Sequence, residues 1–203
     1  DLYQVHWPDA ETPIDETLKA LDDMIHQGKI LYAGCSNFSA VQIEQCAHLA
    51  ERYNITRFDS VQPVYSMFSR KIEAELLPWC GQTGVGVVVY SPLAQGLLTG
   101  KYRQGQPLPE ASRWAERGEA GMHERYGRNV LEKVEMLIAI AGRCDKTLSQ
   151  LALAWILRRP EVTSAIIGAT RVSQVEENVA QSDWRIPDDM LEEIEQVLAI
   201  PPT

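Results

Sequence analysis

The sequence predicts an α/β fold built on a parallel sheet, and two patterns carry this prediction. Five short apolar runs have the composition of strands, and amphipathic helical segments lie between them. The run Val85–Val89 is apolar on both faces, as a strand covered by helices on both sides requires. The early strands recur about every 25 to 30 residues, which is the spacing of repeated strand–helix units.

The first predicted strand ends in His6 and Trp7 and is followed at once by Pro8. A strand that delivers a titratable ring and a large aromatic ring to its carboxyl end is typical of an active site in an α/β barrel. Each further strand is a short apolar run bounded by turn residues. The five predicted strands are Leu2–His6, Ile30–Gly34, Ser60–Val64, Val85–Tyr90 and Ser164–Ile167.

Helix-start and helix-stop residues mark the segments between the strands. Thr12 is predicted to cap the first helix, which Gly28 ends. Ser39 and Gln42 form a capping box for the second helix, which runs to about Tyr53. Four more helices are predicted: Ile72–Cys80, Leu151–Leu157 after a cap at Thr147, one capped by Ser173, and the terminal Asp188–Val197.

A long segment from about Gly100 to Arg128, rich in Gly, Pro and charge, is predicted as a loop that precedes an extra helix. A loop of this length is usually functional or mobile. No linker-like boundary divides the chain, so we expect a single domain over 1–203. Because 203 residues are fewer than the roughly 250 of a complete barrel and no initiator Met is present, we expect this domain to be N-terminally incomplete.

Composition excludes several functional classes. A formal net charge of −9 without a basic patch argues against nucleic-acid binding. The 4 cysteines lack Cys-x-x-Cys spacing and a histidine cluster, so we expect no metal site and reduced thiols in the cytoplasm. No apolar run approaches ~18 residues, so no membrane span is expected.

The residues at the predicted strand ends indicate a ligand. His6, Asn37, Gln62 and Tyr90 offer an imidazole, two amides and an aromatic ring, but no carboxylate pair. A glycosidase needs two flanking acids, and a barrel metallohydrolase needs several His or Asp ligands. Amides that can bind a carboxamide, beside an aromatic face that can stack on a heterocycle, instead suit nicotinamide.

The last strand carries an anion signal. Gly168 permits close backbone approach, Arg171 adds a charged fork, and a helix start follows, where backbone N–H groups favour phosphate. Taken singly, His6 is more often a rim histidine and Arg171 a surface charge. Their joint occurrence at successive strand ends favours a nucleotide site.

These segments resemble the aldo-keto reductase superfamily, in particular its bacterial, potassium-channel-β-like branch. Residues Asp1–Pro8 resemble its fourth strand with His-Trp, and residues 28–38 resemble its Gly-Lys-Ile-Arg-x-x-Gly-Val-Ser-Asn-Phe signature. Residues 90–102 resemble its seventh-strand segment, and residues 167–178 its NADP-gripping end. The resemblance implies a parallel (β/α)8 TIM barrel, of which this chain supplies about five βα units (strands 4–8) and a C-terminal helix.

The resemblance also implies NADP(H)-dependent reduction of aldehydes or ketones, with roles for particular residues. His6 would polarise the substrate carbonyl as the one catalytic residue in this chain, and Trp7 would wall the substrate pocket. At the nicotinamide, the implied cofactor-binding residues are Ser36, Asn37 and Gln62 at the carboxamide and Tyr90 stacked on the ring. At the pyrophosphate they are Ser91, Leu93, Gly96 and Lys101. At the other end of the cofactor they are Gly168, Thr170 and Arg171, with Arg171 at the 2′-phosphate, and Gln174, Glu177 and Asn178 around the adenine.

One departure from the family pattern limits what is implied. The family's catalytic Tyr, Lys and Asp belong to the first three βα units, and this chain begins at the fourth, so we expect them upstream. Two alternatives stay open: a nucleotide-binding regulatory subunit of the same fold, like the potassium-channel β subunits, or a non-functional partial barrel. The expected partner is a small carbonyl substrate, and a homo-oligomer is possible.

Overall fold

The computed structural model describes residues 1–180 and 183–201 and divides them into two compact units. The first unit comprises residues 1–64, 71–90 and 160–164, and the second comprises residues 65–70, 91–159 and 165 onward. Each unit has its own buried core and is described by itself.

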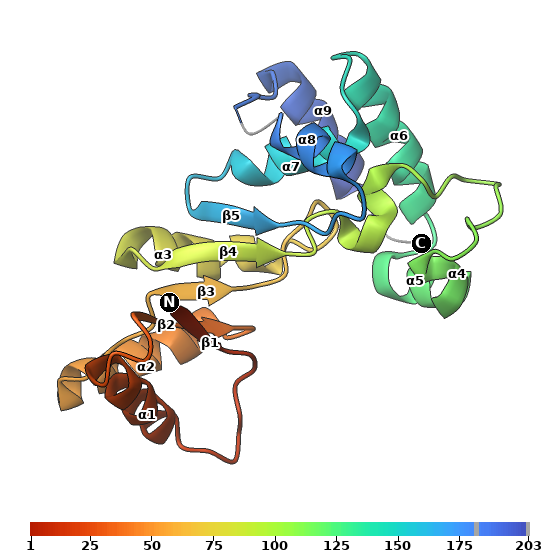
Figure 1. The fold of residues 1–203 in the computed structure, drawn as a ribbon. Helices are drawn as coiled ribbons and strands as arrows, with labels where there is room; N and C mark the ends of the chain where they lie inside the picture. Colours follow the sequence, from red (N-terminus) through yellow and green to blue (C-terminus); the bar gives the residue numbers. More distant parts are fainter. Residues whose placement is uncertain (181–182, 202–203) are drawn as a thin grey trace. The chain divides into compact units, whose positions relative to one another are not determined.

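Five strands form one sheet in the order β1-β2-β3-β4-β5 (Figure 1). Neighbouring strands from β1 to β4 pair in parallel, as the strand–helix alternation predicted. The ends differ from the prediction by about one or two residues, which is the usual uncertainty of such boundaries. The strands are β1 Leu2–Val5, β2 Tyr32–Ser36, β3 Ser60–Gln62, β4 Gly86–Tyr90 and β5 Val162–Ile166, the last of which continues into the second unit.

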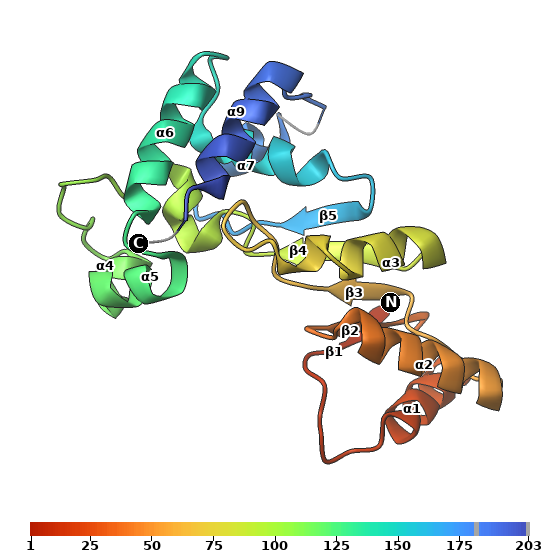
Figure 2. The ribbon, with the colours of Figure 1, turned by 180° about the vertical axis from the view of Figure 1, so that it is seen from behind.

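Three helices of the first unit, seen from behind in Figure 2, follow the first three strands: α1 Ile14–His26, α2 Ala40–Tyr53 and α3 Leu76–Thr83. Helix α2 contacts both α1 and α3. Leu18 and Leu21 of α1 and Ile43 of α2 are buried, because apolar residues spaced by three and four positions share one helix face. A 3₁₀ turn, η1 Lys71–Glu73, precedes α3, so the predicted third helix begins later than Ile72.

The helix ends test the predicted caps. Ser39 and Gln42 form the expected capping box at the start of α2. The cap assigned to Thr12 is wrong: α1 begins at Ile14 after Pro13, and the Thr12 hydroxyl donates to the Asp9 carboxylate at 2.8 Å. An ionised carboxylate is a strong acceptor for this hydroxyl, and no side-chain cap hydrogen bond forms at the start of α1.

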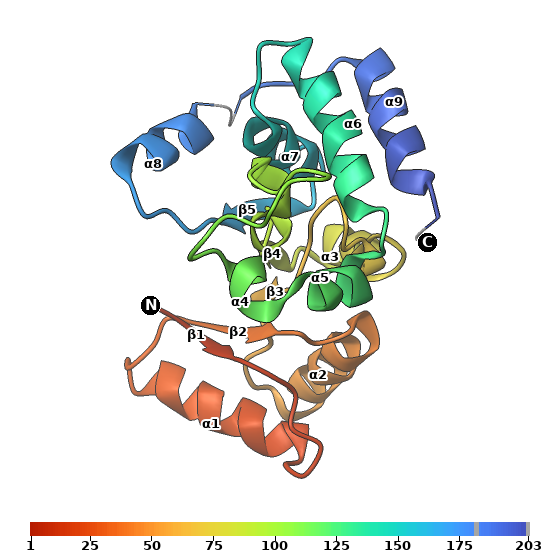
Figure 3. The ribbon, with the colours of Figure 1, turned by 90° about the vertical axis from the view of Figure 1, so that its right-hand side faces the viewer.

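The second unit is built on three helices, α6 Val130–Gly142, α7 Leu148–Leu157 and α9 Asp188–Ala199. Helix α6 lies beside α9 and also contacts α7 (Figure 3). Trp155 is fully buried in this core, where its ring lies 5.5 Å from the ring of Tyr65. A 3₁₀ element, η2 Ala94–Thr99, and helix α8 Val172–Val179 complete the unit with two short helices described next.

The prediction of a continuous loop from Gly100 to Arg128 is wrong in its second half. Helices α4 Arg113–Arg117 and α5 Glu119–Tyr126 form there, before the extra helix that the sequence predicted and that is α6. Ser112 caps α4 by accepting from the Ala115 amide at 3.4 Å. Trp114 and Met122 are buried, so two apolar anchors hold a segment whose composition is otherwise that of a loop.

No helix in residues 1–180 and 183–201 has the length and apolar character needed to span a bilayer.

Candidate functional site

A hydrogen-bonded cluster lies at the carboxyl ends of β2, β3 and β4 in the first unit. The Asn37 amide nitrogen donates to Ser36 Oγ at 3.0 Å, and the Tyr90 hydroxyl donates to Asn37 Oδ1 at 2.9 Å. Ser36 Oγ donates to the carbonyl oxygen of Gln62 at 2.8 Å. The structure thus brings together all four residues that the sequence assigned to the nicotinamide.

The backbone of Asn37 adopts a left-handed conformation, with φ of 63°. Asparagine tolerates this region better than most residues with a Cβ. Its backbone N–H donates to the Gln62 carbonyl oxygen at 3.2 Å, so the turn continues the pairing of β2 with β3 past the end of the strand. Such strained residues are concentrated at functional sites.

His6 and Trp7 follow β1, and both side chains are exposed, Trp7 by 58%. His6 joins the cluster through its backbone, because its carbonyl oxygen accepts from the Asn37 side-chain amide at 3.0 Å. The two rings lie 5.9 Å apart. The imidazole therefore has an accessible position beside the cluster, whose amide fixes the end of β1.

The second unit contains a cavity of about 320 Å³ that gathers most of the residues assigned to the phosphates and adenine. Its lining includes Leu93, Lys101, Gly168, Arg171, Gln174, Glu177 and Asn178, together with Thr99, Thr147 and Ser149, which the sequence analysis did not assign to the site. Ser91, Gly96 and Thr170 are not among its lining residues. Lys101 and Arg171 bring two cations to a cavity that holds one carboxylate, that of Glu177.

Thr147 is the clearest omission from the predicted site. It caps α7, as the sequence predicted, and its hydroxyl also donates to Glu177 Oε1 at 2.8 Å. The Gln150 side-chain amide donates to the Glu177 carbonyl oxygen at 3.4 Å. The capping signal located Thr147 on its helix, but only the packing of α7 against α8 shows that it orients a carboxylate of the cavity.

The prediction that Ser173 caps the next helix is wrong. Helix α8 begins at Val172, and Arg171 occupies the N-cap position. The Gln174 side-chain oxygen accepts from the backbone amides of Thr170 at 2.8 Å and Arg171 at 3.2 Å. Gln174 thus fixes the backbone around two of the predicted phosphate residues, and the Ser173 hydroxyl is not needed for the helix start.

The segment after β4 is strained. Ser91, Ala94 and Gln95 all have positive φ, between 47° and 56°, and Gly96 has φ of 95°. A left-handed residue with a Cβ costs of order 1–3 kcal/mol. At Gly96 an added Cβ would also lie 3.0 Å from Lys101 Cε. Glycine therefore keeps the Lys101 side chain in place beside the cavity.

Two groups of predicted site residues are thus formed, one in each unit, and the chain passes from one to the other at Tyr90 and Ser91. Within the described part of the chain, no group of three or more His, Cys, Asp or Glu side chains is arranged to hold a metal ion. The groups present offer hydrogen bonds and positive charge.

The family model described as the aldo/keto reductase family matches residues 1–199. The chain belongs to the aldo/keto reductase family. This confirms the family resemblance carried by the His-Trp, Ser-Asn-Phe and Gly-Ala-Thr-Arg segments.

Named relatives of this aldo/keto reductase chain fall into two groups. A probable voltage-gated potassium channel subunit beta of Arabidopsis thaliana is 41% identical over 100% of the chain and 62% of its own length. An L-glyceraldehyde 3-phosphate reductase of Escherichia coli (strain K12) is 34% identical over 98% of the chain and 58% of its own length. The chain thus spans about 60% of the length of the curated relatives it matches.

A solved structure of a glycerol dehydrogenase from Gluconobacter oxydans matches the whole aldo/keto reductase chain with a TM-score of 0.82 and 29% identity, over 61% of its own length. The predicted α/β barrel class is thereby confirmed, with five strand–helix units present in this chain.

Proposed function

We propose that the protein is an NADP(H)-dependent oxidoreductase that reduces aldehydes or ketones to alcohols. The observation that carries the proposal is the cavity of the second unit, where Lys101 and Arg171 face a carboxylate held by Thr147. Two cations suit phosphate groups, and an oriented carboxylate can accept from the exocyclic amino group of adenine. This donor and acceptor set fits an adenine nucleotide that carries an additional phosphate.

The first unit supplies the groups that suit the nicotinamide end. The amide of Asn37 and the hydroxyl of Ser36 can bind a carboxamide, and Tyr90 can stack on the ring. Tyr90 keeps a fixed position because its hydroxyl donates to Asn37. NADPH, when bound, supplies the hydride; the role of these residues is to hold and orient its carboxamide. The accessible imidazole of His6 would orient the carbonyl oxygen of the substrate.

A fluorescence titration of the chain with NADPH and NADH tests the cofactor assignment. We expect NADPH to bind more tightly, because only it carries the 2′-phosphate assigned to Arg171. Arg171→Ala should weaken NADPH by about tenfold to a hundredfold, since a charged hydrogen bond contributes ~1.5–3 kcal/mol, and should leave NADH nearly unchanged. Arg185→Ala removes an exposed arginine outside the cavity and is the matched control. Equal affinity of the unaltered chain for the two nucleotides contradicts the proposal.

A nucleotide-binding regulatory subunit is the second candidate, favoured by the 36 to 41% identity to three proteins named as potassium channel β subunits. Both candidates require nucleotide binding, so turnover separates them. NADPH consumption with a panel of aldehydes and ketones, measured on the complete gene product, supports the reductase. Tight NADPH binding without consumption of any carbonyl compound favours the regulatory subunit.

A further inference from the structure

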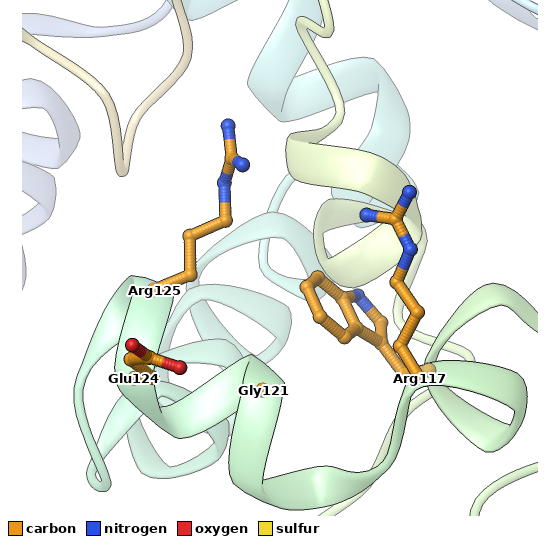
Figure 4. A pocket seen from close by; sticks show the side chains of 5 residues that line it. Arg117, Gly121, Glu124 and Arg125 are labelled. Atoms are coloured by element: carbon orange, nitrogen blue, oxygen red, sulfur yellow. The ribbon is translucent and has the colours of Figure 1, made fainter.

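A second cavity, of about 470 Å³, lies beside α4 and α5 in the second unit. Its lining consists of Trp114, Arg117, Gly121, Glu124 and Arg125 and shares no residue with the candidate dinucleotide cavity. In Figure 4 the side chains of Arg117 and Arg125 extend along two sides of the cavity, with both guanidinium groups toward its upper end. The Glu124 carboxylate lies lower, beside helix α5.

In the part of the chain that the structure describes, the two cavity arginines have no acidic partner, unlike four other arginines of the same unit. Within the described residues, neither Arg117 nor Arg125 forms an ion pair with a carboxylate. Four other arginines form ion pairs with glutamates: Arg70 and Arg158 share Glu195, Arg103 pairs with Glu135, and Arg143 pairs with Glu193. In a chain with a net charge of −9, two neighbouring cations without acidic partners form a local site for an anion.

Neutral groups hold these guanidinium groups in place. Arg117 Nη1 donates to Gln95 Oε1 at 3.2 Å, and the Arg125 guanidinium lies 5.6 Å from the centre of the Tyr126 ring. Contacts of this kind orient a cation without neutralising it. Burial raises the pKa of Tyr126, while Arg125, Arg113 and Arg117 act in the opposite direction, so the field of all three arginines reaches this phenol.

Trp114 is the buried side chain of the lining, whereas its three charged side chains are exposed. Trp114 is 1% exposed, and its ring meets the Tyr126 ring edge-on at 5.9 Å. The cavity volume falls within the range of sites that bind small molecules, which combine apolar walls with a few charged groups. A ligand that suits this arrangement is compact and has one doubly charged anionic end.

We propose that this cavity binds the phosphate group of a small phosphorylated metabolite, with Arg117 and Arg125 as the side chains that bind the phosphate. The planar guanidinium fork matches the geometry of phosphate oxygens. The two guanidinium charges outweigh the single carboxylate charge of Glu124. The site is independent of the proposed reductase activity.

Calorimetric titration of the chain with glycerol 3-phosphate, and with uncharged glycerol as the matched compound, tests the site. We expect glycerol 3-phosphate to bind, glycerol to bind at least about tenfold more weakly, and affinity to fall as salt is added. Arg117→Gln combined with Arg125→Gln should lower glycerol 3-phosphate affinity at least about tenfold. Arg128→Gln, which removes an exposed arginine of the same segment outside the cavity, should leave it unchanged.

Gly121 gives a second test that leaves every charge in place. A Cβ at Gly121 would meet no heavy atom within 4 Å, so a side chain can enter the cavity without a clash. Gly121→Leu should block glycerol 3-phosphate, whereas Gly121→Ala should bind it nearly as well as the unaltered chain. Melting curves of both variants verify that they fold.

Titration with 2′,5′-ADP distinguishes this site from the candidate dinucleotide cavity. The arginine double variant should bind 2′,5′-ADP as the unaltered chain does, while Arg171→Ala should weaken that ligand and spare glycerol 3-phosphate. Loss of 2′,5′-ADP binding in the double variant would assign these arginines to the dinucleotide and overturn the proposal. Failure of glycerol 3-phosphate to bind, or binding that the double variant leaves unchanged, overturns it as well. Absence of 2′,5′-ADP binding by the unaltered chain counts against the proposed cofactor alone.

Discussion

The hydroxyl of Tyr90, at the end of β4, donates to the side-chain oxygen of Asn37, just beyond β2, at 2.9 Å. The two residues are 53 positions apart in the chain, and their strands lie on either side of β3. Asn37 also donates to Ser36 Oγ and to the carbonyl oxygen of His6. One amide therefore joins the carboxyl ends of three strands.

Removal of the Asn37 amide should destabilise the chain more than removal of the Tyr90 hydroxyl. Asn37→Ala loses three hydrogen bonds and places an alanine at positive φ, at a cost of about 2–4 kcal/mol. Tyr90→Phe loses one neutral hydrogen bond, at a cost of about 1 kcal/mol. Urea denaturation followed by circular dichroism measures both free energies of unfolding. Asn37→Gly, which removes the same amide without backbone strain, should fall between them, and equal costs for all three variants would rule out the central role of the amide.

Thr147 should contribute both to stability and to the cavity. Thr147→Val loses the α7 cap, at a cost of about 1 kcal/mol, and releases the Glu177 carboxylate. We expect NADPH affinity to fall by about twofold to tenfold, since a neutral donor has been removed from a carboxylate. Thr147→Ser retains the hydroxyl and is the control in both the melting and the titration experiments. Unchanged NADPH affinity in Thr147→Val would show that the carboxylate does not need this donor.

The Arg103–Glu135 pair should contribute stability that depends on pH. Hydrogen bonding by Arg103, at 2.6 and 2.7 Å, lowers the pKa of Glu135 from its ordinary value of 4.5. Because the folded state holds this carboxylate ionised, its contribution is complete above the unfolded pKa and is lost as pH falls through the folded pKa. The free energy of unfolding of Glu135→Gln should therefore lie below that of the unaltered chain at neutral pH.

The difference in free energy of unfolding between Glu135→Gln and the unaltered chain should narrow as the pH falls below about 4.5. Glu132→Gln, at an exposed position on the same helix, controls for the loss of one acidic charge. If this difference stays constant as the pH falls, the Arg103–Glu135 pair does not determine how the stability of the chain responds to acid.

The cysteines should differ in reactivity. Cys35, Cys46 and Cys80 are buried, and burial raises the pKa of Cys46 and Cys80 to about 11 and raises that of Cys35 as well. Since the thiolate is the reactive form, these three thiols should resist a disulfide reagent at neutral pH. Cys144 is only partly buried and should react first. Mass spectrometry after brief labelling tests this order, which rapid modification of Cys35 in the folded chain would contradict.

Local patterns were enough to locate most helices and strands. The capping boxes at Ser39 and Thr147 involve residues three positions apart, and the apolar spacing of Leu18 and Leu21 reports one helix face. Strand ends were less accurate, and Thr12 was misassigned because the nearby Asp9 carboxylate binds its hydroxyl. Whether the Thr12 side chain binds Asp9 or caps the helix is a matter of geometry, which a residue pattern does not contain.

Contacts between distant segments depended on the tertiary fold. The order of residues revealed the αβ alternation and the polar strand ends, because each follows from composition or from spacings of a few residues. The bond between Tyr90 and Asn37, the hold of Thr147 on Glu177 and the unpaired arginines beside Trp114 required strand register and helix packing. The two hydrogen bonds join residues tens of positions apart, and the two arginines are distinguished by the absence of a carboxylate partner among the described residues. Only the folded chain determines which residues meet in this way.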